Sequence, residues 1–250
     1  MLLHKHNLET YRNLVDMFQK YNRVAVVQPT GTGKSFLMLQ LIADNSDKQF
    51  LIASPSTYIF SQIQTHAENY QISLDNCSYM TYAKLASLDE NTFPSLDCDY
   101  IILDEIHRCG ATEWSKGVEH LLAAKQNTKV FGTSATPIRY LDSSRNMAEE
   151  LFEGHYAVNM SLAEAIRKKI LPLPIYITTW YSFYGDIARL EKRAEESGNP
   201  YFKQLLHGKI QKAKSTIADL DCGIETIFAR HMTNPSGKYI VFCANTERLQ

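Results

Sequence analysis

Hydrophobic and polar positions alternate with two different periods along the first half of the chain. Between residues 8 and 18, apolar side chains recur every three or four positions, which predicts an amphipathic helix. Short β-branched runs bounded by turn residues predict strands. The predicted strands are 23–28, 49–54, 77–81, 100–103 and 129–132, and the further predicted helices are 36–43 and 57–70. This alternation predicts an α/β fold with a parallel sheet and helices on both faces, in which loops at the carboxyl ends of the strands build the functional site.

The pattern loosens beyond residue 137. The elements predicted there are short helices at 147–152 and 162–169, a strand at 175–181, mostly helical stretches at 186–194 and 201–231, a turn at 234–237 and a strand at 239–243. We therefore expect a domain at 1–172, a mainly helical segment at 173–237 and the start of a second domain at 238–250. Because seven residues after the last strand cannot complete a sheet, we expect a piece of a longer protein.

Composition narrows the class of protein. The 250 residues carry 26 Lys and Arg against 27 Asp and Glu, and 44% are hydrophobic, which is typical of a globular protein. No apolar run approaches the ~20 residues of a membrane span and no signal peptide is recognisable, so we expect a cytoplasmic protein without a membrane partner. The formal net charge of −1 means that any nucleic-acid site is local. Five irregularly spaced cysteines argue against a zinc or disulfide framework.

The turn after the first predicted strand has the residues of a phosphate-binding loop. It follows G-x-x-x-x-G-K-[ST], except that Gln28 occupies the first glycine position. Its glycines let backbone N–H groups converge on phosphates, and the next helix directs its positive end toward them. Lys34 would contact the β- and γ-phosphates and Ser35 would bind Mg²⁺. A structural glycine turn is the alternative. The candidate nucleotide-binding residues are Pro29, Thr30, Gly31, Thr32, Gly33, Lys34 and Ser35.

An acidic pair follows the most apolar predicted strand. Asp104 can hold Mg²⁺ at the end of that strand, and Glu105 can polarise an attacking water. An acidic helix amino terminus is the alternative interpretation. With a phosphate-binding loop earlier in the same sheet, the pair favours catalysis, and the candidate catalytic residues are Lys34, Asp104 and Glu105.

Together these motifs resemble the superfamily 2 helicases and translocases of the DEAD/DEAH type, in the DExH form, close to bacterial proteins of the restriction-enzyme kind. In chain order, 29–35 resembles motif I, Ser54-Pro55 motif Ia, Thr81-Tyr82 motif Ib, 104–107 motif II, 134–136 motif III and 239–245 the strand of motif IV. The resemblance covers the whole chain. It implies a RecA-like ATP-binding lobe at 1–172, a helical interlobe segment and the first strand of a second RecA-like lobe.

The resemblance also implies roles for individual residues. Lys34 and Ser35 would bind ATP and magnesium, and Asp104 would bind magnesium. Glu105 would orient or deprotonate the hydrolytic water. The residues that would couple nucleotide state to nucleic-acid grip are His107, Ser134 and Thr136, for which a capping or core role and turn hydrogen bonds are the alternatives.

Two departures from the family pattern affect the nucleotide site. Many relatives read adenine with a glutamine before the first helix, and the nearest residue here is Asn7, for which a helix cap is an equal interpretation. The arginine fingers of the family's second lobe have no counterpart after residue 243. The resemblance therefore implies modest nucleotide binding and slow hydrolysis by this chain alone.

Nucleic acid is the implied partner, together with the missing second lobe. In relatives, the loops of motifs Ia and Ib contact the phosphodiester backbone, which makes Ser54, Pro55, Ser56, Thr81 and Tyr82 the candidate contacts. A second candidate is the stretch 201–218, whose charged residues are Lys203, Lys209, Lys212 and Lys214 with His207 and no acid. A solvated helix face is the favoured interpretation of those lysines, ahead of a binding surface.

The leading hypothesis is the ATP-binding lobe of a DNA or RNA helicase or translocase. DNA is favoured because 136–139 and 162–166 are similar to bacterial DNA-translocating relatives. An ATP-dependent switch that organises a protein partner without translocating is the alternative, and a P-loop kinase suits the downstream motifs poorly.

Overall fold

The computed structural model describes residues 3–139, 144–175, 184–218, 224–234, 236, 237 and 239. The chain divides into two compact units, Met1–Leu173 and Pro174–Gln250, and each is described by itself. All the predicted motifs except the last strand lie in the first unit.

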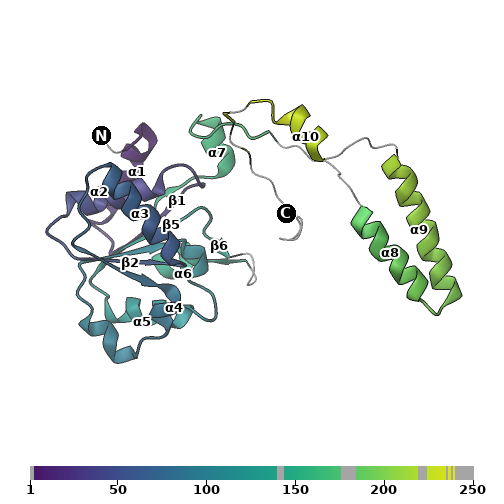
Figure 1. Cartoon of the computed structure of the whole chain (residues 1–250). Helices are drawn as coiled ribbons and strands as arrows, with labels where there is room; N and C mark the ends of the chain where they lie inside the picture. The colour runs from purple at the N-terminus through teal and green to yellow at the C-terminus, as the bar shows by residue number, and fades with distance from the viewer. Residues whose placement is uncertain are drawn as a thin grey trace. The chain divides into compact units, whose positions relative to one another are not determined.

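A six-stranded parallel sheet forms the centre of the first unit (Figure 1). In spatial order its strands are β3 (Cys77–Thr81), β2 (Phe50–Ser54), β4 (Tyr100–Asp104), β5 (Lys129–Ser134), β1 (Arg23–Val27) and β8 (Tyr156–Asn159). Every neighbouring pair is parallel. A separate antiparallel ribbon pairs β6 (Ile138–Arg139) with β7 (Arg145–Asn146). The predicted parallel sheet is confirmed, and each of the five predicted strands ends within two residues of its observed bound.

Helices cover both faces of this sheet because successive strand side chains point in opposite directions. The helices are α1 (Lys5–Met17), α2 (Lys34–Asp44), α3 (Thr57–Asn69), α4 (Tyr82–Ala86), α5 (Ser115–Ala124), α6 (Met147–Phe152) and α7 (Leu162–Arg167), with 3₁₀ turns η1 (Glu90–Ser95) and η2 (Ile106–Arg108). From β1, Val24 and Val26 enter a core shared with α1, α2 and α3, whereas Ala25 enters a second core shared with α4, α5 and α6. The predicted α/β layering is therefore confirmed.

The sequence patterns did not predict α5 and β8. Gly117 weakens the helical signal of α5, yet a Cβ at this position would lie 2.5 Å from the backbone nitrogen of Ala86. The glycine thus lets α5 approach α4 closely. In β8 only Ala157 is buried, so no apolar run marks the strand, and its pairing with β1 creates it.

The second unit contains a helical hairpin. Helices α8 (Tyr184–Glu196) and α9 (Pro200–Ala218) pack against each other, and α10 (Ile224–His231) follows (Figure 1). A small core of Ile187, Ala194, Leu206 and Ile210 joins the first two helices. The predicted strands at 175–181 and 239–243 fall almost entirely outside the described residues, so both stay predictions.

None of the helices in the described part of the chain has both the length and the apolar character needed to cross a bilayer.

Candidate active site

The predicted motifs meet at one edge of the sheet. Because the strands are parallel, the loops after β1, β4 and β5 all emerge at their carboxyl ends. A cavity of about 330 Å³ opens there. Its lining from these loops and from the start of α2 is Thr30, Gly31, Gly33, Lys34, Ser35, Asp104 and Glu105. The structure thus brings the phosphate-binding loop and the acidic pair together. Pro29 is buried, and the carbonyl oxygen of Thr32 accepts a hydrogen bond from Asn7 of α1.

The loop conformation depends on its two glycines. Gly31 and Gly33 have φ angles of +85° and +92°, which side-chain-bearing residues adopt only with strain. A Cβ on Gly33 would also lie 2.8 Å from the Asn7 side-chain nitrogen. Gly33 is the N-cap of α2, so the helix begins at Lys34 and presents its unpaired N–H groups beside the cavity.

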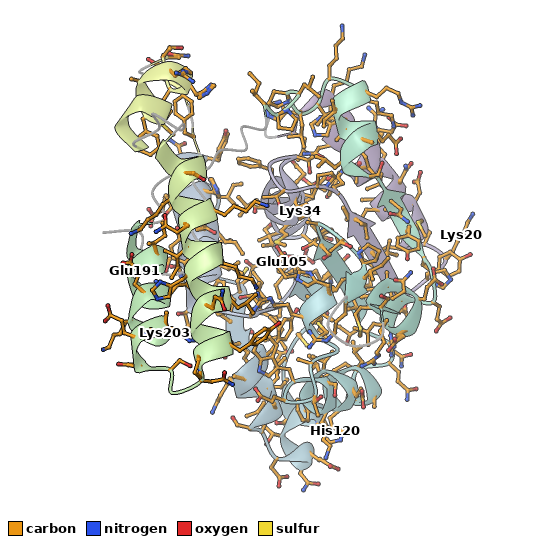
Figure 2. All side chains as sticks on the ribbon, turned by 90° about the vertical axis from the view of Figure 1, so that its right-hand side faces the viewer. Lys20, Lys34, Glu105, His120, Glu191 and Lys203 are labelled. Carbon is orange, nitrogen blue, oxygen red and sulfur yellow. The ribbon has the colours of Figure 1, made fainter. Side chains whose placement is uncertain are left out.

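Lys34 bends back over its own loop. Its Nζ donates to the carbonyl oxygens of Gln28, at 2.9 Å, and Pro29, at 3.4 Å. Burial lowers the pKa of Lys34, while the nearby charges of Glu105 and Asp104 oppose this shift. Figure 2 shows Lys34 and Glu105 close together in the first unit. The ammonium group is therefore held by neutral carbonyls, which an anionic phosphate can replace as stronger partners.

Helix α1 braces the loop from behind. The Asn7 Nδ2 donates to the carbonyl oxygens of Thr32, at 2.8 Å, and Gly33, at 3.3 Å. His6 Nε2 lies 2.9 Å from the same Thr32 oxygen and must be its donor, since a carbonyl only accepts. Gln28 replaces the first glycine of the motif and is buried, and it donates to Thr10 of α1 at 3.0 Å. These contacts fix the loop against the helix.

Both interpretations of Asn7 are corrected by this arrangement. It is not a helix cap, because the N-cap of α1 is His4. It is also not placed for a bidentate contact with adenine, because the side chain is fully buried and its nitrogen is engaged on two loop carbonyls. Its role in this structure is to position the phosphate-binding loop.

The two acidic side chains have different environments. Asp104 is 9% exposed, and burial raises the pKa of its carboxyl group, whereas a 2.5 Å hydrogen bond from Thr133 Oγ1 to Oδ1 opposes that rise. The His107 ring nitrogen lies 3.2 Å from Glu105 Oε2 and holds the pKa of that carboxyl below its usual value. Both carboxyl groups line the cavity beside Lys34.

Glu105 has an uncommon backbone conformation. Its φ is +55°, in the left-handed region that non-glycine residues seldom adopt. The preceding carbonyl oxygen, that of Asp104, accepts a 2.6 Å hydrogen bond from the buried hydroxyl of Tyr82. Such conformations persist when their surroundings fix them. Tyr82 is thus a positioning residue for the backbone that carries Glu105.

A hydrogen-bond chain joins the loops after β4 and β5. Ser134 Oγ donates to the Thr136 carbonyl at 2.5 Å, which uses its only hydrogen. The 2.9 Å contact between Ser134 Oγ and His107 Nδ1 must then be donated by the imidazole. Nδ1 of His107 therefore carries a hydrogen. The same Nδ1 lies 3.2 Å from Glu105 Oε2, so Ser134 and Glu105 both approach one donor.

The donor set suits magnesium. Ser35 and Asp104 line one cavity and offer oxygen ligands, and Thr133 engages only one oxygen of the carboxylate. Across the described ranges, no group of three or more His, Cys, Asp or Glu side chains is arranged to hold a metal. Mg²⁺ commonly takes one or two protein ligands together with phosphate oxygens and water, so these two residues fit it.

Two of the predicted nucleic-acid contacts are corrected by burial. The side chain of Ser54 is fully buried and its hydroxyl donates to the Ser56 carbonyl. Tyr82 is also fully buried. Neither side chain can reach a polymer, because each faces the interior at the end of its strand. Ser56 is exposed, and Pro55 and Thr81 are half-buried, so these three stay predictions.

Sequence reasoning missed the supporting residues of the site. Thr10 and Gln28 brace the loop, Thr133 binds Asp104, and Tyr82 holds the backbone before Glu105. The one feature of the sequence that could have indicated them is a polar residue next to an apolar run, such as Gln28 directly after a valine-rich strand.

Comparison with protein families finds one match. The family described as "Type III restriction enzyme, res subunit" matches residues 1–139, more than half of the chain. The resemblance predicted from the motifs is confirmed by this match. Comparison with curated proteins finds none that matches.

The chain is also similar to three solved structures that are described as an ATPase core or a helicase. The chain is similar to the SWI2/SNF2 ATPase core of Sulfolobus solfataricus in complex with dsDNA, with 13% identity and a TM-score of 0.48, over 85% of this chain and 57% of that one. It is similar to the DEAH/RHA helicase HrpB of Escherichia coli, with 19% identity and a TM-score of 0.49, over 76% of this chain and 27% of that one. It is also similar to the Hef helicase domain of Pyrococcus furiosus, with 17% identity and a TM-score of 0.46, over 86% of this chain and 56% of that one. The chain thus spans less than two thirds of each.

Proposed function

This chain belongs to the family of type III restriction enzyme res subunits, and we propose that it is the ATP-binding lobe of a nucleic-acid-dependent ATPase that moves on DNA. The first unit is a RecA-like P-loop lobe, as predicted. One observation carries the proposal: Lys34, Asp104 and Glu105 line a single cavity at the carboxyl edge of the sheet. A binding module without hydrolysis would not need Glu105 there.

The proposed chemistry is in-line attack of water on the γ-phosphate of ATP. Lys34 exchanges its loop carbonyls for phosphate oxygens, and the N–H groups at the start of α2 bind the same phosphates. Ser35 and Asp104 would hold Mg²⁺, which neutralises charge on the phosphates. Glu105 lines the same cavity, and its carboxylate would accept a hydrogen from the attacking water.

The base and ribose have a proposed place beside the loop. A second cavity, of about 560 Å³, is bounded on one side by Gly31, Thr32 and Gly33 and on the other by the start of α1 and residues 168–170. Because both cavities are lined by the glycine loop, we propose that the nucleotide lies across this loop, with its phosphates in the first cavity and its base and ribose in the second.

Coupling to the polymer is proposed to run through His107, Ser134 and Thr136. Loss of the γ-phosphate changes the water and the charge beside Glu105, which His107 contacts. A turn of the imidazole would break its bond to Ser134 and free the loop after β5. Such a rearrangement would link the nucleotide site to the loop after β5, which a motor requires and a passive lobe does not.

The rest of the proposed motor lies beyond the first unit. We propose the ATP-binding lobe at 1–172, an interlobe segment at 173–237, and a second RecA-like lobe that begins at 238–250 and supplies arginines to the phosphates. Such arginines contribute about 10³ to 10⁵ in rate in related ATPases. The chain alone is therefore expected to bind ATP and hydrolyse it slowly.

ATP hydrolysis with different polymers tests this proposal. The rate is measured on this chain and on a version extended through the second lobe, with single-stranded DNA, duplex DNA or RNA. Stimulation of the extended protein by one polymer, lost in Glu105→Gln while ATP binding remains, is the expected result. ATP binding without polymer stimulation in either protein would instead favour a switch that organises a protein partner.

A further inference from the structure

The second helix of the hairpin is basic along its whole length. Between Pro200 and Ala218, α9 carries four lysines and one histidine but no acidic residue. The neighbouring α8 carries charges of both signs. Its basic residues are Arg189, Lys192 and Arg193, and its acidic residues are Asp186, Glu191, Glu195 and Glu196. The imbalance therefore belongs to α9 and is not shared by the hairpin as a whole.

One face of α9 is occupied by α8. Leu206 and Ile210 are buried in the hairpin core, and Ala213 packs against it. The Lys214 Nζ lies 2.5 Å from Glu191 Oε1 across the two helices. Figure 2 shows the two helices adjacent, with Glu191 on one and Lys203 on the other. Lys214 thus serves the hairpin, and the sequence-based group of four lysines divides into separate faces.

The opposite side of α9 carries a shallow groove of about 470 Å³, which we name the α9 outer face. Its residues recur at helical spacing. They are Tyr201, Gln204, Leu205, Gly208, Lys209 and Lys212. Tyr201 is 77% exposed and Leu205 is 45% exposed, so an aromatic ring and an aliphatic chain stand in solvent beside two lysines. Apolar and cationic groups therefore share one continuous surface.

Gly208 lies in the middle of this surface. A glycine inside a helix is less stable than an alanine, because it has no side chain and leaves the backbone more conformational freedom. Within the described residues, a Cβ at this position would meet no atom within 4 Å. The helix backbone at Gly208 is therefore open on this face, and a partner can approach it closely.

We propose that the α9 outer face binds the sugar-phosphate backbone of nucleic acid. Lys209 and Lys212 pair with phosphates, Tyr201 and Leu205 pack on sugars or bases, and Gly208 admits the backbone to the helix surface. Charge complementarity selects a polyanion, because α9 contains no acid that would repel phosphate. The inference extends the proposed function by adding a second contact to those expected at the loops after β2 and β3.

Salt-dependent DNA binding by the whole 250-residue chain tests the proposal. Fluorescence anisotropy of a labelled single-stranded oligonucleotide and of its duplex is measured from about 50 to 200 mM salt. The variant Lys209→Glu/Lys212→Glu is expected to weaken binding about tenfold or more at low salt. It is also expected to reduce the slope of log Kd against log salt by about 1 to 2, since each phosphate contact contributes about 0.7 to 0.9.

The matched control is Lys192→Glu/Arg193→Glu on α8, which changes the net charge equally and should change affinity less than twofold. A second variant, Gly208→Ala, should raise the melting temperature of the hairpin yet weaken DNA binding, a combination that a purely structural role cannot produce. Circular dichroism checks that each variant keeps its helices.

Equal DNA affinity in Lys209→Glu/Lys212→Glu and in the α8 control would overturn the inference, and the outer face would then be assigned to a protein partner. No DNA binding by the unaltered chain would overturn it as well. ATP affinity is measured on the same samples. If the unaltered chain binds ATP and DNA, and the lysine variant binds DNA equally well, only this inference is overturned. If the unaltered chain does not bind ATP, the proposed function is overturned.

Discussion

Positive charge is presented in two contrasting ways in this chain. Lys34 is half-buried, its ammonium group is held by two loop carbonyls, and burial lowers its pKa. Lys209 and Lys212 are exposed on the outer face of a helix. A buried cation interacts strongly and only with a partner of the right shape, whereas exposed cations interact weakly, with any phosphate, and are screened by salt.

The structure around Lys34 is also more extensively packed than the structure around Lys209 and Lys212. The phosphate-binding loop is attached to a six-stranded sheet with two hydrophobic cores and is braced by α1. The hairpin has a core of four buried residues. Few buried contacts imply low local stability, which a surface that follows a polymer can tolerate. Geometry that positions a phosphate to within an ångström needs the more rigid surroundings.

The largest expected effect separates the two cations directly. Lys34→Ala should weaken ATP binding about 10- to 100-fold, because it removes charge-assisted hydrogen bonds worth about 1.5 to 3 kcal/mol. DNA affinity in the absence of nucleotide should stay within twofold. Titration with a fluorescent ATP analogue and with labelled DNA gives both values. Equal losses of ATP and DNA affinity would show that the two sites are not independent.

An intermediate effect is expected from the backbone support of Glu105. Tyr82→Phe removes the hydroxyl that donates to the Asp104 carbonyl and should lower kcat about tenfold, about 1.4 kcal/mol, with KM for ATP unchanged. The extended protein is the one to measure. Tyr79→Phe is the matched control, because the Tyr79 hydroxyl is buried without a hydrogen-bond partner, so its removal should leave kcat unchanged. A parallel rise of KM in Tyr82→Phe would point to general disorder of the site instead.

The smallest expected effect is a pH dependence of ATP affinity, which should be confined to the buried site. The proposed magnesium site needs the deprotonated Asp104, whose pKa is raised by burial, so Mg²⁺-dependent ATP affinity should fall on acidification at a higher pH than for an ordinary aspartate. The Thr133 hydrogen bond lowers that pKa, so Thr133→Val should move the acidic limb further upward. ATP affinity measured in the presence of Mg²⁺ from about pH 4 to 8 gives the midpoint of this acidic loss. DNA binding through lysines should not share this limb, and an unshifted midpoint would contradict the assigned role of Thr133.

Much of the site could be predicted because its chemistry is local in sequence. Glycines that need positive φ, a lysine at the start of a helix, and an acidic pair after an apolar strand are each recognisable within a few residues. Parallel topology then required these loops to meet at one edge of the sheet. The hidden supports depend on partners far along the chain, such as Tyr82 with Asp104 and Asn7 with Thr32.

The corrections have the same physical origin. The sequence does not show whether a hydroxyl or amide side chain in a motif faces solvent or the core. Ser54, Tyr82 and Asn7 were expected to contact ligands, yet all three are fully buried and bond to backbone groups. Buried polar groups must find partners inside the protein, and the partners available are fixed by packing.

The sequence by itself determined the α/β class, five strands of the parallel sheet, and the positions of the glycine-rich loop and the acidic pair, because periodicity and turn chemistry are properties of neighbouring residues. Tertiary structure alone decided that β8 joins the sheet beside β1, that α5 packs on α4 at Gly117, and which face of α9 is left exposed. These features depend on contacts between distant segments, and only the folded chain brings those segments together.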